Sequence, residues 1–373
     1  MKKNTAEFAG RTVGMDVGDE YCHLAALDCE GGLVEETRIT TSRKSVDAYF
    51  ARIPRSRVVV EAGTHSRWIS RIIEKGGHEV IVANPRRLAL IYGSDSKSDR
   101  NDAVSLARLG RIDVNLLSPI KHRDERAQAD LVLIRSRDVL VKSRTQMVNH
   151  VRGITKSFGV RLRKCSTDCF HRRVKESMDS IPEVLQPAVV PMLDVIEDLS
   201  KMISRYDKAV EEIARKRYPE TERLRQVAGV GPLTSLAYVL TIEDPHRFPT
   251  SRKVGSYLGL RPRRDASGSR DPALRITKAG NSTMRRLLVG SAQYILGPFG
   301  PDCDLRRWGM KLAERGGKNA KKRAVVAVAR KLSVLLHRLW VRGADYDPLR
   351  NAKRLEHLKR ELKGSYVIDG IEM

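Results

Sequence analysis

The sequence has few aromatic residues, few cysteines and no long hydrophobic run. Aromatic side chains make up 5% of the 373 residues, which disfavours a platform that stacks unpaired bases. Five cysteines, an odd number spread along the chain, do not describe a disulfide framework. No stretch approaches the roughly 20 apolar residues that cross a bilayer, and the N-terminal residues lack the apolar core of a signal peptide. We therefore expect a cytoplasmic bacterial protein with reduced thiols and no membrane partner.

Acidic residues are scarce relative to basic ones. The chain has 70 lysines and arginines against 45 acidic residues, a net charge of +25 and a sequence pI near 10.1. A surplus of this size favours nucleic acid as the partner, through its phosphate backbone. A duplex or a folded RNA therefore fits better than an unpaired strand. The length is sufficient for two or three domains, each with its own core.

The N-terminal part alternates short β-rich runs with helical patterns. We expect strands over residues 12–17, 23–27, 33–40, 57–61 and 79–84, and helices over residues 45–52 and 66–75. The first three strands are separated by tight turns and predict an antiparallel meander. The succession of strand, helix and strand that follows predicts a parallel pair with a right-handed crossover. Residues 1–118 are thus expected to form an α/β domain with a mixed sheet.

Four carboxylates occur where such a sheet could gather them. Asp16 lies within the first strand, Glu61 ends a parallel strand, and Asp99 and Asp102 open a helix for which Ser98 is a plausible N-cap. Carboxylates that hold two divalent ions are what metal-assisted phosphodiester cleavage requires, and oxygen ligands suit Mg²⁺ or Mn²⁺. Helix capping and the helix dipole also explain an aspartate in a first turn. We call these four residues the carboxylate set.

The middle of the chain, residues 119–222, predicts long charged helices over about 124–151 and 193–213. Apolar residues in the second helix step by three and four, as in a heptad seam: Ile196, Leu199, Ile203, Tyr206, Val210 and Ile213. We expect a coiled-coil hairpin broken at the proline-marked region 182–191. A helical spacer and a dimerising arm are both open interpretations. Cys165, Cys169 and His171 lack a fourth ligand nearby for a zinc site, and we expect them to be structural.

Residues 223–345 predict a mainly helical, strongly basic domain, followed by a charged tail at 346–373. The segment Gly229-Val230-Gly231-Pro232 has the form of a helix-hairpin-helix, in which glycines and a helix N-terminus approach phosphate. A glycine turn between two packed helices is the alternative. The candidate nucleic-acid contacts are Gly229, Gly231, Arg263, Arg264, Arg270 and Lys278.

Ser267 lies in the basic loop of residues 263–269. A serine that attacks phosphorus needs its proton removed and the phosphate charge neutralised, and the loop arginines can meet the second need. Taken alone, Ser267-Gly268-Ser269 is simply a turn.

Two sets of motifs resemble the DEDD transposases of bacterial insertion sequences, the group that includes pilin-gene invertases and bridge-RNA-guided recombinases. Residues 13–17, 59–62, 84–85 and 97–103 resemble the family's RuvC-like (ribonuclease-H-like) catalytic domain. The C-terminal transposase domain is matched by Gly229-Val230-Gly231-Pro232, Arg247-Phe248, Tyr257-Leu258-Gly259-Leu260, Pro262-Arg263, Ser267-Gly268 and 276–281. One departure is Ala62-Gly63-Thr64, where the family often has Ala-Thr-Gly.

This resemblance implies that the carboxylate set (Asp16, Glu61, Asp99 and Asp102) binds the metal ions and that Ser267 forms a covalent phosphoserine link to DNA. It also implies a tetramer in which the RuvC-like domain of one subunit completes the site around the serine of another. In guided members a noncoding RNA pairs with donor and target DNA. We therefore expect a transposase or site-specific recombinase that forms homo-oligomers and is guided by RNA.

Two alternatives remain open from the sequence. The first is a junction-resolving nuclease that cuts with metal-activated water, in which Ser267 only touches phosphate. The second is a non-catalytic nucleic-acid-binding protein descended from a transposase.

Overall fold

The computed structural model describes residues 10–85, 98–267, 272 and 274–354, and the chain divides into two compact units, Met1–Arg123 and Asp124–Met373. The strands of the first unit are β1 (Thr12–Val17), β2 (Tyr21–Leu27), β3 (Leu33–Thr40), β4 (Arg57–Glu61) and β5 (Glu79–Ala83). Its helices are α1 (Arg43–Arg52), α2 (Ser66–Lys75), α4 (Asp99–Ile112) and the 3₁₀ turn Val114–Leu117.

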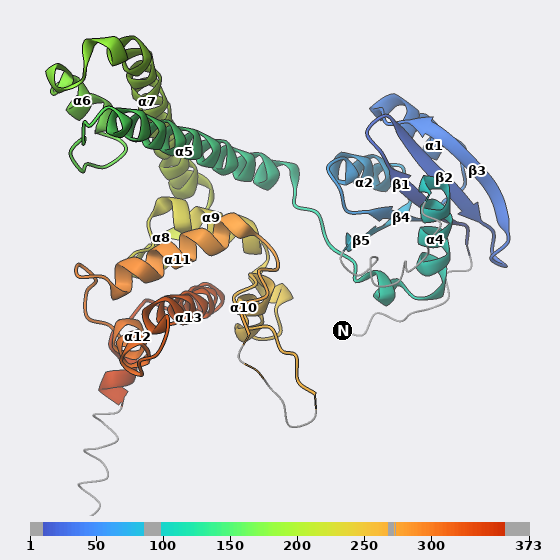
Figure 1. The fold of residues 1–373 in the computed structure, drawn as a ribbon. Coiled ribbons are helices and arrows are strands. Elements are labelled where there is room, and N and C mark those ends of the chain that lie inside the picture. Colours follow the sequence, from blue (N-terminus) through green and yellow to red (C-terminus); the bar gives the residue numbers. More distant parts are fainter. Residues whose placement is uncertain (1–9, 86–97, 268–271, 273, 355–373) are drawn as a thin grey trace, which may run out of the picture. The chain divides into compact units, whose positions relative to one another are not determined.

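The five strands form one mixed sheet in the order β3-β2-β1-β4-β5 (Figure 1). Strands β1, β2 and β3 pair antiparallel, whereas β4 pairs parallel with both β1 and β5. The predicted meander and the predicted parallel pair are both confirmed. This order, with helices on both faces, is consistent with a ribonuclease-H-like domain.

Alternation along the central strands sorts their side chains between two helical layers. Val13 and Met15 of β1 pack in the cluster that α1 and α2 cover. Side chains of the intervening positions point to the opposite face of the sheet, where α4 packs. By the same alternation Asp16 and Glu61 belong to the α4 face, because Val60 lies in the α1 and α2 cluster.

The second unit begins with a long helical hairpin, which we call the arm. It comprises α5 (Glu125–Ser157), the short α6 (Phe170–Lys175) at the tip, and α7 (Gln186–Arg217) (Figure 1). Asp130 pairs with Arg217, and Arg137 pairs with Asp207, so the two long helices run antiparallel. The 3₁₀ turns Met178–Ser180 and Glu183–Leu185 lead into α7. No helix within the described ranges is long and apolar enough to cross a membrane.

The arm differs from the prediction at the start of its second helix. We expected a break over residues 182–191, but α7 begins at Gln186 and includes Pro191. Pro187 fits the first turn, where an N–H has no intrahelical partner, whereas Pro191 lies inside the helix and removes one hydrogen bond to the carbonyl oxygen four residues earlier. The predicted seam is buried at Ile196 and Ile203 but only partly buried at Leu199.

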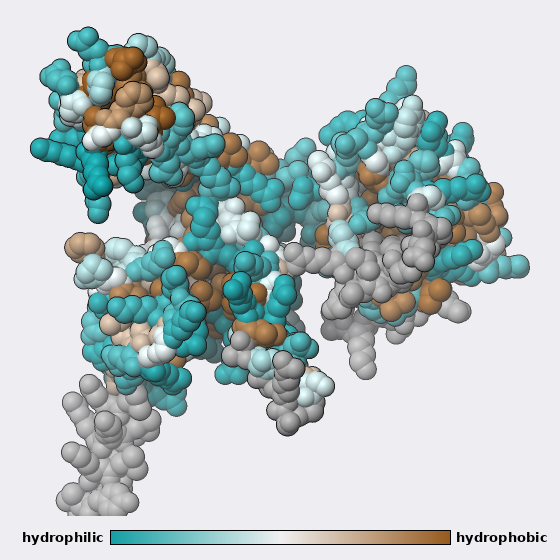
Figure 2. Space-filling model, viewed as in Figure 1, coloured by the Kyte–Doolittle hydropathy of each residue, from teal (hydrophilic) through white to brown (hydrophobic). Residues whose placement is uncertain are grey.

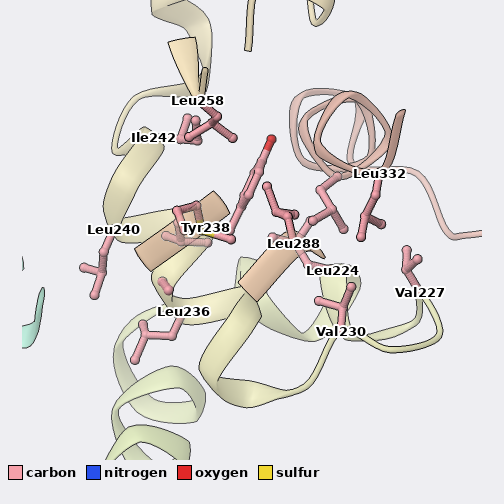
Figure 3. Packing of buried hydrophobic residues seen from close by; sticks show 14 of the residues in the cluster. Leu224, Val227, Val230, Leu236, Tyr238, Leu240, Ile242, Leu258, Leu288 and Leu332 are labelled. Atoms are coloured by element: carbon pink, nitrogen blue, oxygen red, sulfur yellow. The ribbon is translucent and has the colours of Figure 1, made fainter. Parts of the chain in front are cut away.

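The remaining helices pack around one large core. They are α8 (Glu220–Arg225), α9 (Pro232–Ile242), α10 (Arg252–Tyr257), α11 (Ser282–Leu296), α12 (Asp304–Glu314) and α13 (Ala320–Arg342), with the 3₁₀ turn Pro245–Arg247. Figure 3 shows Tyr238 of α9 among Leu288 of α11 and Leu332 of α13. The buried hydroxyl of Tyr238 donates a hydrogen bond to the carbonyl oxygen of Ser333 at 2.6 Å, which satisfies the polar group. The base of the arm joins the same core through Leu131 and Val210.

Candidate catalytic centre and serine-bearing segment

The N-terminus of α4 brings two members of the carboxylate set to the sheet. Ser98 is its N-cap, as predicted, and the Ser98 hydroxyl accepts a hydrogen bond from the backbone N–H of Asn101 at 3.2 Å. Asp99 and Asp102 occupy the first turn, where the helix dipole stabilises negative charge. The cap therefore fixes the point on the chain at which these carboxylates begin the helix.

Helix α4 lies unusually close to β1 because Gly14 has no side chain. An added Cβ atom at Gly14 would lie 2.5 Å from the amide nitrogen of Ala107 and closer still to the carbonyl oxygen of Ala103. Gly110, near the other end of the helix, similarly faces the Val59 side chain on β4. Backbone-to-backbone packing at Gly14 thus sets the height of Asp99 and Asp102 above Asp16.

The members of the carboxylate set influence one another electrostatically. Burial, and after it the negative charges of Asp99, Asp102 and Glu61, together raise the pKa of Asp16 to about 6. His23, the register partner of Asp16 on β2, acts in the opposite direction. Its Nε2 lies 3.8 Å from Oδ2 of Asp99. All four carboxylates predicted from the sequence are therefore brought to one face of the sheet.

A divalent cation fits the chemistry of this donor set. The negative charges of Asp99, Asp102 and Glu61 repel the charged form of Asp16, and a bound cation would relieve this repulsion. Carboxylate oxygens are also the ligands that hard divalent ions prefer. Within the described residues, no three acidic, histidine or cysteine side chains are already close enough together to hold an ion. Asp99 is exposed and Asp102 half-buried, so their side chains can approach a cation by rotation. The metal-ligand assignment remains a prediction.

Two neighbours of this centre were not predicted. His23 has no motif around it, and only its register opposite Asp16 indicates its place. Arg100, which follows Asp99, forms an ion pair with Glu36 on β3. Because Glu36 lies two strands from Asp16, this pair could be found only after the sheet order was known.

Ser267 lies in the second unit, on a segment whose two ends are held together. Its side chain is exposed. At the base, the Arg263 N–H donates to the carbonyl oxygen of Arg275, and the Thr277 N–H to that of Arg261, both at 2.9 Å. Pro262 and Ile276 form an isolated antiparallel bridge between the two ends of the segment.

Two glycines allow the backbones at the two ends of this segment to approach each other closely. Gly259 has φ +69°, and a Cβ atom there would lie 2.7 Å from the carbonyl carbon of Lys278. Gly280 also has φ +69° and packs against the carbonyl oxygen of Tyr257. Side chains are excluded at both positions by conformation and by space. The glycine motifs therefore hold together the base of the segment that carries Ser267.

A large basic cavity adjoins this segment. It has a volume of about 1550 Å³ and is bounded by residues 260–264, α13 and residues 344–351. Arg263, Arg264 and Lys278 line it and are exposed, as expected for contacts with phosphate. The candidate Arg270 lies outside the described residues. Apolar residues such as Trp308 line the same cavity, and Lys331 Nζ stands 3.8 Å from the Trp308 ring centroid.

The other glycine motif forms the turn between α8 and α9. Gly229 has φ +80°, and a Cβ atom there would approach Ser291 and Tyr294 of α11 to about 3 Å, so close helix packing accounts for this glycine. Gly231 is the N-cap of α9 and has open space beside it. An open groove of about 870 Å³ runs between this turn and α11, with Arg225 and Arg286 in its wall.

The cysteines of the arm are reduced. Cys165 and Cys169 are partly exposed and His171 is buried, and among the residues described they form no site with three or more metal-binding groups. Cys169 instead shares a hydrogen bond with the Ser166 hydroxyl at 3.2 Å.

Comparison with known proteins gives two family matches and several full-length relatives. Residues 13–158 match the DEDD transposase model of the IS110 group, and residues 221–301 match the transposase IS116/IS110/IS902 family. The transposase for insertion sequence element IS1111A of Coxiella burnetii is 27% identical over 343 residues, covering 90% of this chain and 91% of the relative. A probable family 20 transposase of Pseudomonas aeruginosa is 26% identical over 341 residues, covering 90% and 98%.

The fold and the two matches, in this order along one chain, define a DEDD-type insertion-sequence transposase, an enzyme that cleaves and joins DNA. The DEDD class implies dependence on a divalent metal ion. Within that class the chain belongs to the IS110 family. The resemblance inferred from the sequence motifs is thereby confirmed.

Proposed function

We propose that this transposase cuts and rejoins DNA through a covalent bond between Ser267 and the DNA backbone. The carboxylate set holds Mg²⁺ or Mn²⁺, which neutralises charge on the phosphate when bound. The supporting observation is the gathering of Asp16, Glu61, Asp99 and Asp102 on one face of the sheet, with the pKa of Asp16 raised to about 6. A carboxylate with only a structural role is normally stabilised by an ion pair or by capping a helix. Carboxylates that repel one another are instead typical of a site that binds cations.

The proposed reaction is a transesterification. The Ser267 hydroxyl gives up its proton, its oxygen forms a bond to phosphorus, and the bond from phosphorus to one deoxyribose oxygen breaks. The released sugar oxygen takes up a proton. A hydroxyl of the new partner strand then gives up its proton and its oxygen forms a bond to phosphorus, while the bond from phosphorus to the Ser267 oxygen breaks and Ser267 takes up a proton. One phosphate ester replaces another in each step, so rejoining needs no nucleotide cofactor.

The basic residues around the serine-bearing segment are proposed to hold the DNA backbone. Exposed arginines in a shared cavity suit phosphate, because the guanidinium binds two phosphate oxygens at once. The glycine turn before α9 offers backbone N–H groups at a helix N-terminus. The proposed contacts are Gly229, Gly231, Arg263, Arg264, Arg270 and Lys278.

Replacement of the nucleophile provides the direct test. Ser267→Ala should abolish covalent protein–DNA adducts in cells that carry the gene with its native flanking DNA. Ser282→Ala, a matched change at another exposed serine, should leave the adducts unchanged. Adducts detected by denaturing gel in Ser267→Ala would overturn the covalent mechanism. Asp102→Ala should abolish recombination while the protein stays folded.

The same assay separates the two rival functions. A junction-resolving nuclease predicts hydrolysed ends without adducts in the unmodified protein. A non-catalytic binding protein predicts undiminished function when all four carboxylates are replaced. Adducts that disappear on replacing either Ser267 or the carboxylate set support the recombinase.

We further propose that the protein acts on donor and target DNA as a homo-oligomer guided by a structured RNA. Sequencing of the nucleic acid that co-purifies at moderate salt tests the guide. A single discrete RNA that maps beside the gene supports guidance. Random RNA or none, together with active recombination, would mean that the protein itself selects its DNA.

A further inference from the structure

Phe299, in the loop between α11 and α12, is the most exposed large hydrophobic side chain in the described parts of the chain. It is 84% exposed, although Ile295 before it and Leu305 after it are both buried in the large core. Figure 2 shows hydrophobic surface at the end of α11 where this loop begins. A single exposed apolar residue on a flexible loop would be ordinary. The structure of the loop therefore decides whether Phe299 has a role.

The backbone on both sides of Phe299 is held in place. Nη1 of Arg306 donates hydrogen bonds to the carbonyl oxygens of Ile295 and Gly297, at 2.6 and 2.5 Å. A Cβ atom at Gly300 would collide with the Ile295 carbonyl oxygen, so only glycine fits this close approach to α11. Two prolines in the loop restrict its backbone further. The loop therefore presents the ring in a fixed position, which lowers the entropic cost of binding through it.

The loop continues from the helix that forms one wall of the open groove beside the glycine turn. Gln293 and Tyr294, in the last turn of α11, line this groove, and Tyr294 is 48% exposed. The N–H of Gly297 donates to the carbonyl oxygen of Tyr294 at 3.1 Å, so the loop starts about one helical turn, or about 5 Å, from the groove wall. Phosphates of one DNA strand are about 3.4 Å apart along the duplex axis. The groove and Phe299 can therefore contact neighbouring nucleotides.

The charges around the loop favour nucleic acid as its partner. Arg225 and Arg286 lie in the wall of the groove, and no acidic side chain lines it among the residues that the structure describes. Asp302, the acidic residue of the loop, accepts hydrogen bonds of 2.6–3.1 Å from Arg307. Duplex DNA offers phosphates to the arginines and the apolar faces of its bases to the ring.

We propose that Phe299 inserts between two adjacent base pairs of duplex DNA, while Arg225 and the glycine turn contact the phosphates beside that step. The contacts of the glycine turn rest on the proposed function, whereas the apolar wedge is new. Insertion of such a side chain separates the stacked bases and bends the duplex. The bound DNA is therefore unstacked at the step that receives the ring.

Fluorescence of a base analogue tests the insertion. The emission of 2-aminopurine rises when this base is unstacked, and the analogue is placed at one position in each of a series of duplexes from the gene's native flanking DNA. Full-length protein, without divalent metal, should raise the emission at one step only. In Phe299→Ala this rise should be lost and the affinity should fall roughly tenfold. Phe299→Leu keeps an apolar wedge and should keep most of the rise.

Two controls distinguish the wedge from a general loss of binding. Phe158→Ala removes another exposed ring, 52% exposed at the end of α5, and should change neither the emission nor the affinity. Phe299→Ala should leave the slope of log binding constant against log salt unchanged, because the ring carries no charge. Arg225→Ala should instead lower this slope by about 0.9.

Several outcomes would overturn the proposal. They are a bound duplex with no rise in emission at any position, an equal rise in Phe299→Ala, and a rise confined to RNA duplexes. Weaker self-association of Phe299→Ala in analytical ultracentrifugation, with unstacking unchanged, would assign the ring to a protein contact instead. Absence of binding to every duplex would refute both the wedge and the proposed phosphate contacts.

Covalent adducts, measured on the same preparations after metal is added, separate the wedge from the proposed chemistry. Unstacking without adducts would refute only the covalent mechanism. Adducts from a protein that does not unstack the duplex would refute only the wedge.

Discussion

Replacing Gly14 by alanine should separate the two halves of the carboxylate set. The new Cβ atom would lie 2.5 Å from the Ala107 nitrogen, whereas ordinary contact begins at 3.4 Å, so α4 must move by at least 3.4 − 2.5, or about 0.9 Å. The obstructing atoms belong to the backbone, and no change of rotamer relieves them. Overpacking of this kind costs about 1–3 kcal/mol. Because a displacement of about 1 Å at a reacting centre can cost roughly 100-fold in rate, activity should fall more than stability.

The assay compares covalent DNA adducts and thermal unfolding in the full-length protein. Gly14→Ala should reduce adduct formation about 100-fold while the melting temperature falls by several degrees. Gly153→Ala on α5 is the matched control, since nothing lies within 4 Å of its added Cβ atom. It should keep full activity and gain up to about 1 kcal/mol of stability from helix propensity. Unchanged adducts and melting in Gly14→Ala would refute the close-packing argument.

Three further predictions concern charge and backbone. With a chelator present, stability should fall as pH rises from about 4 to 6, because the raised pKa of Asp16 lets the folded chain keep a proton that the unfolded chain loses. Asp16→Asn should flatten this slope and melt higher than the unmodified protein at pH 7.5; equal slopes would contradict it. Gly259→Ala should lose adducts by distorting the base of the serine-bearing segment, whereas Gly290→Ala, with open space beside it, should not. Arg263→Ala should lower the slope of log binding constant against log salt by about 0.9 if this arginine contacts one phosphate, and an unchanged slope would exclude that contact.

Local patterns in the sequence were sufficient for most of the elements and for the candidate carboxylates. The buried run at β4, the cap at Ser98 and the strand carrying Asp16 each depend on neighbouring residues, which is why they could be predicted. The start of α7 could not be placed this way, since a proline near a helix start is compatible with either a break or a first turn. His23 was missed because its contact with Asp99 joins residues far apart in the chain.

The sequence by itself determined the types of secondary structure, the basic character of the chain and its family motifs, because periodicity, caps and composition act over short distances. Only the tertiary structure decided how near α4 comes to β1, and therefore how strongly the carboxylates raise the pKa of Asp16. It also decided which residues of α7 are buried in the arm, since apolar residues at steps of three and four do not specify what each of them packs against. The physical reason is that burial and the interaction between charges depend on distances between segments. The alternation of apolar and polar residues within one segment does not specify these distances.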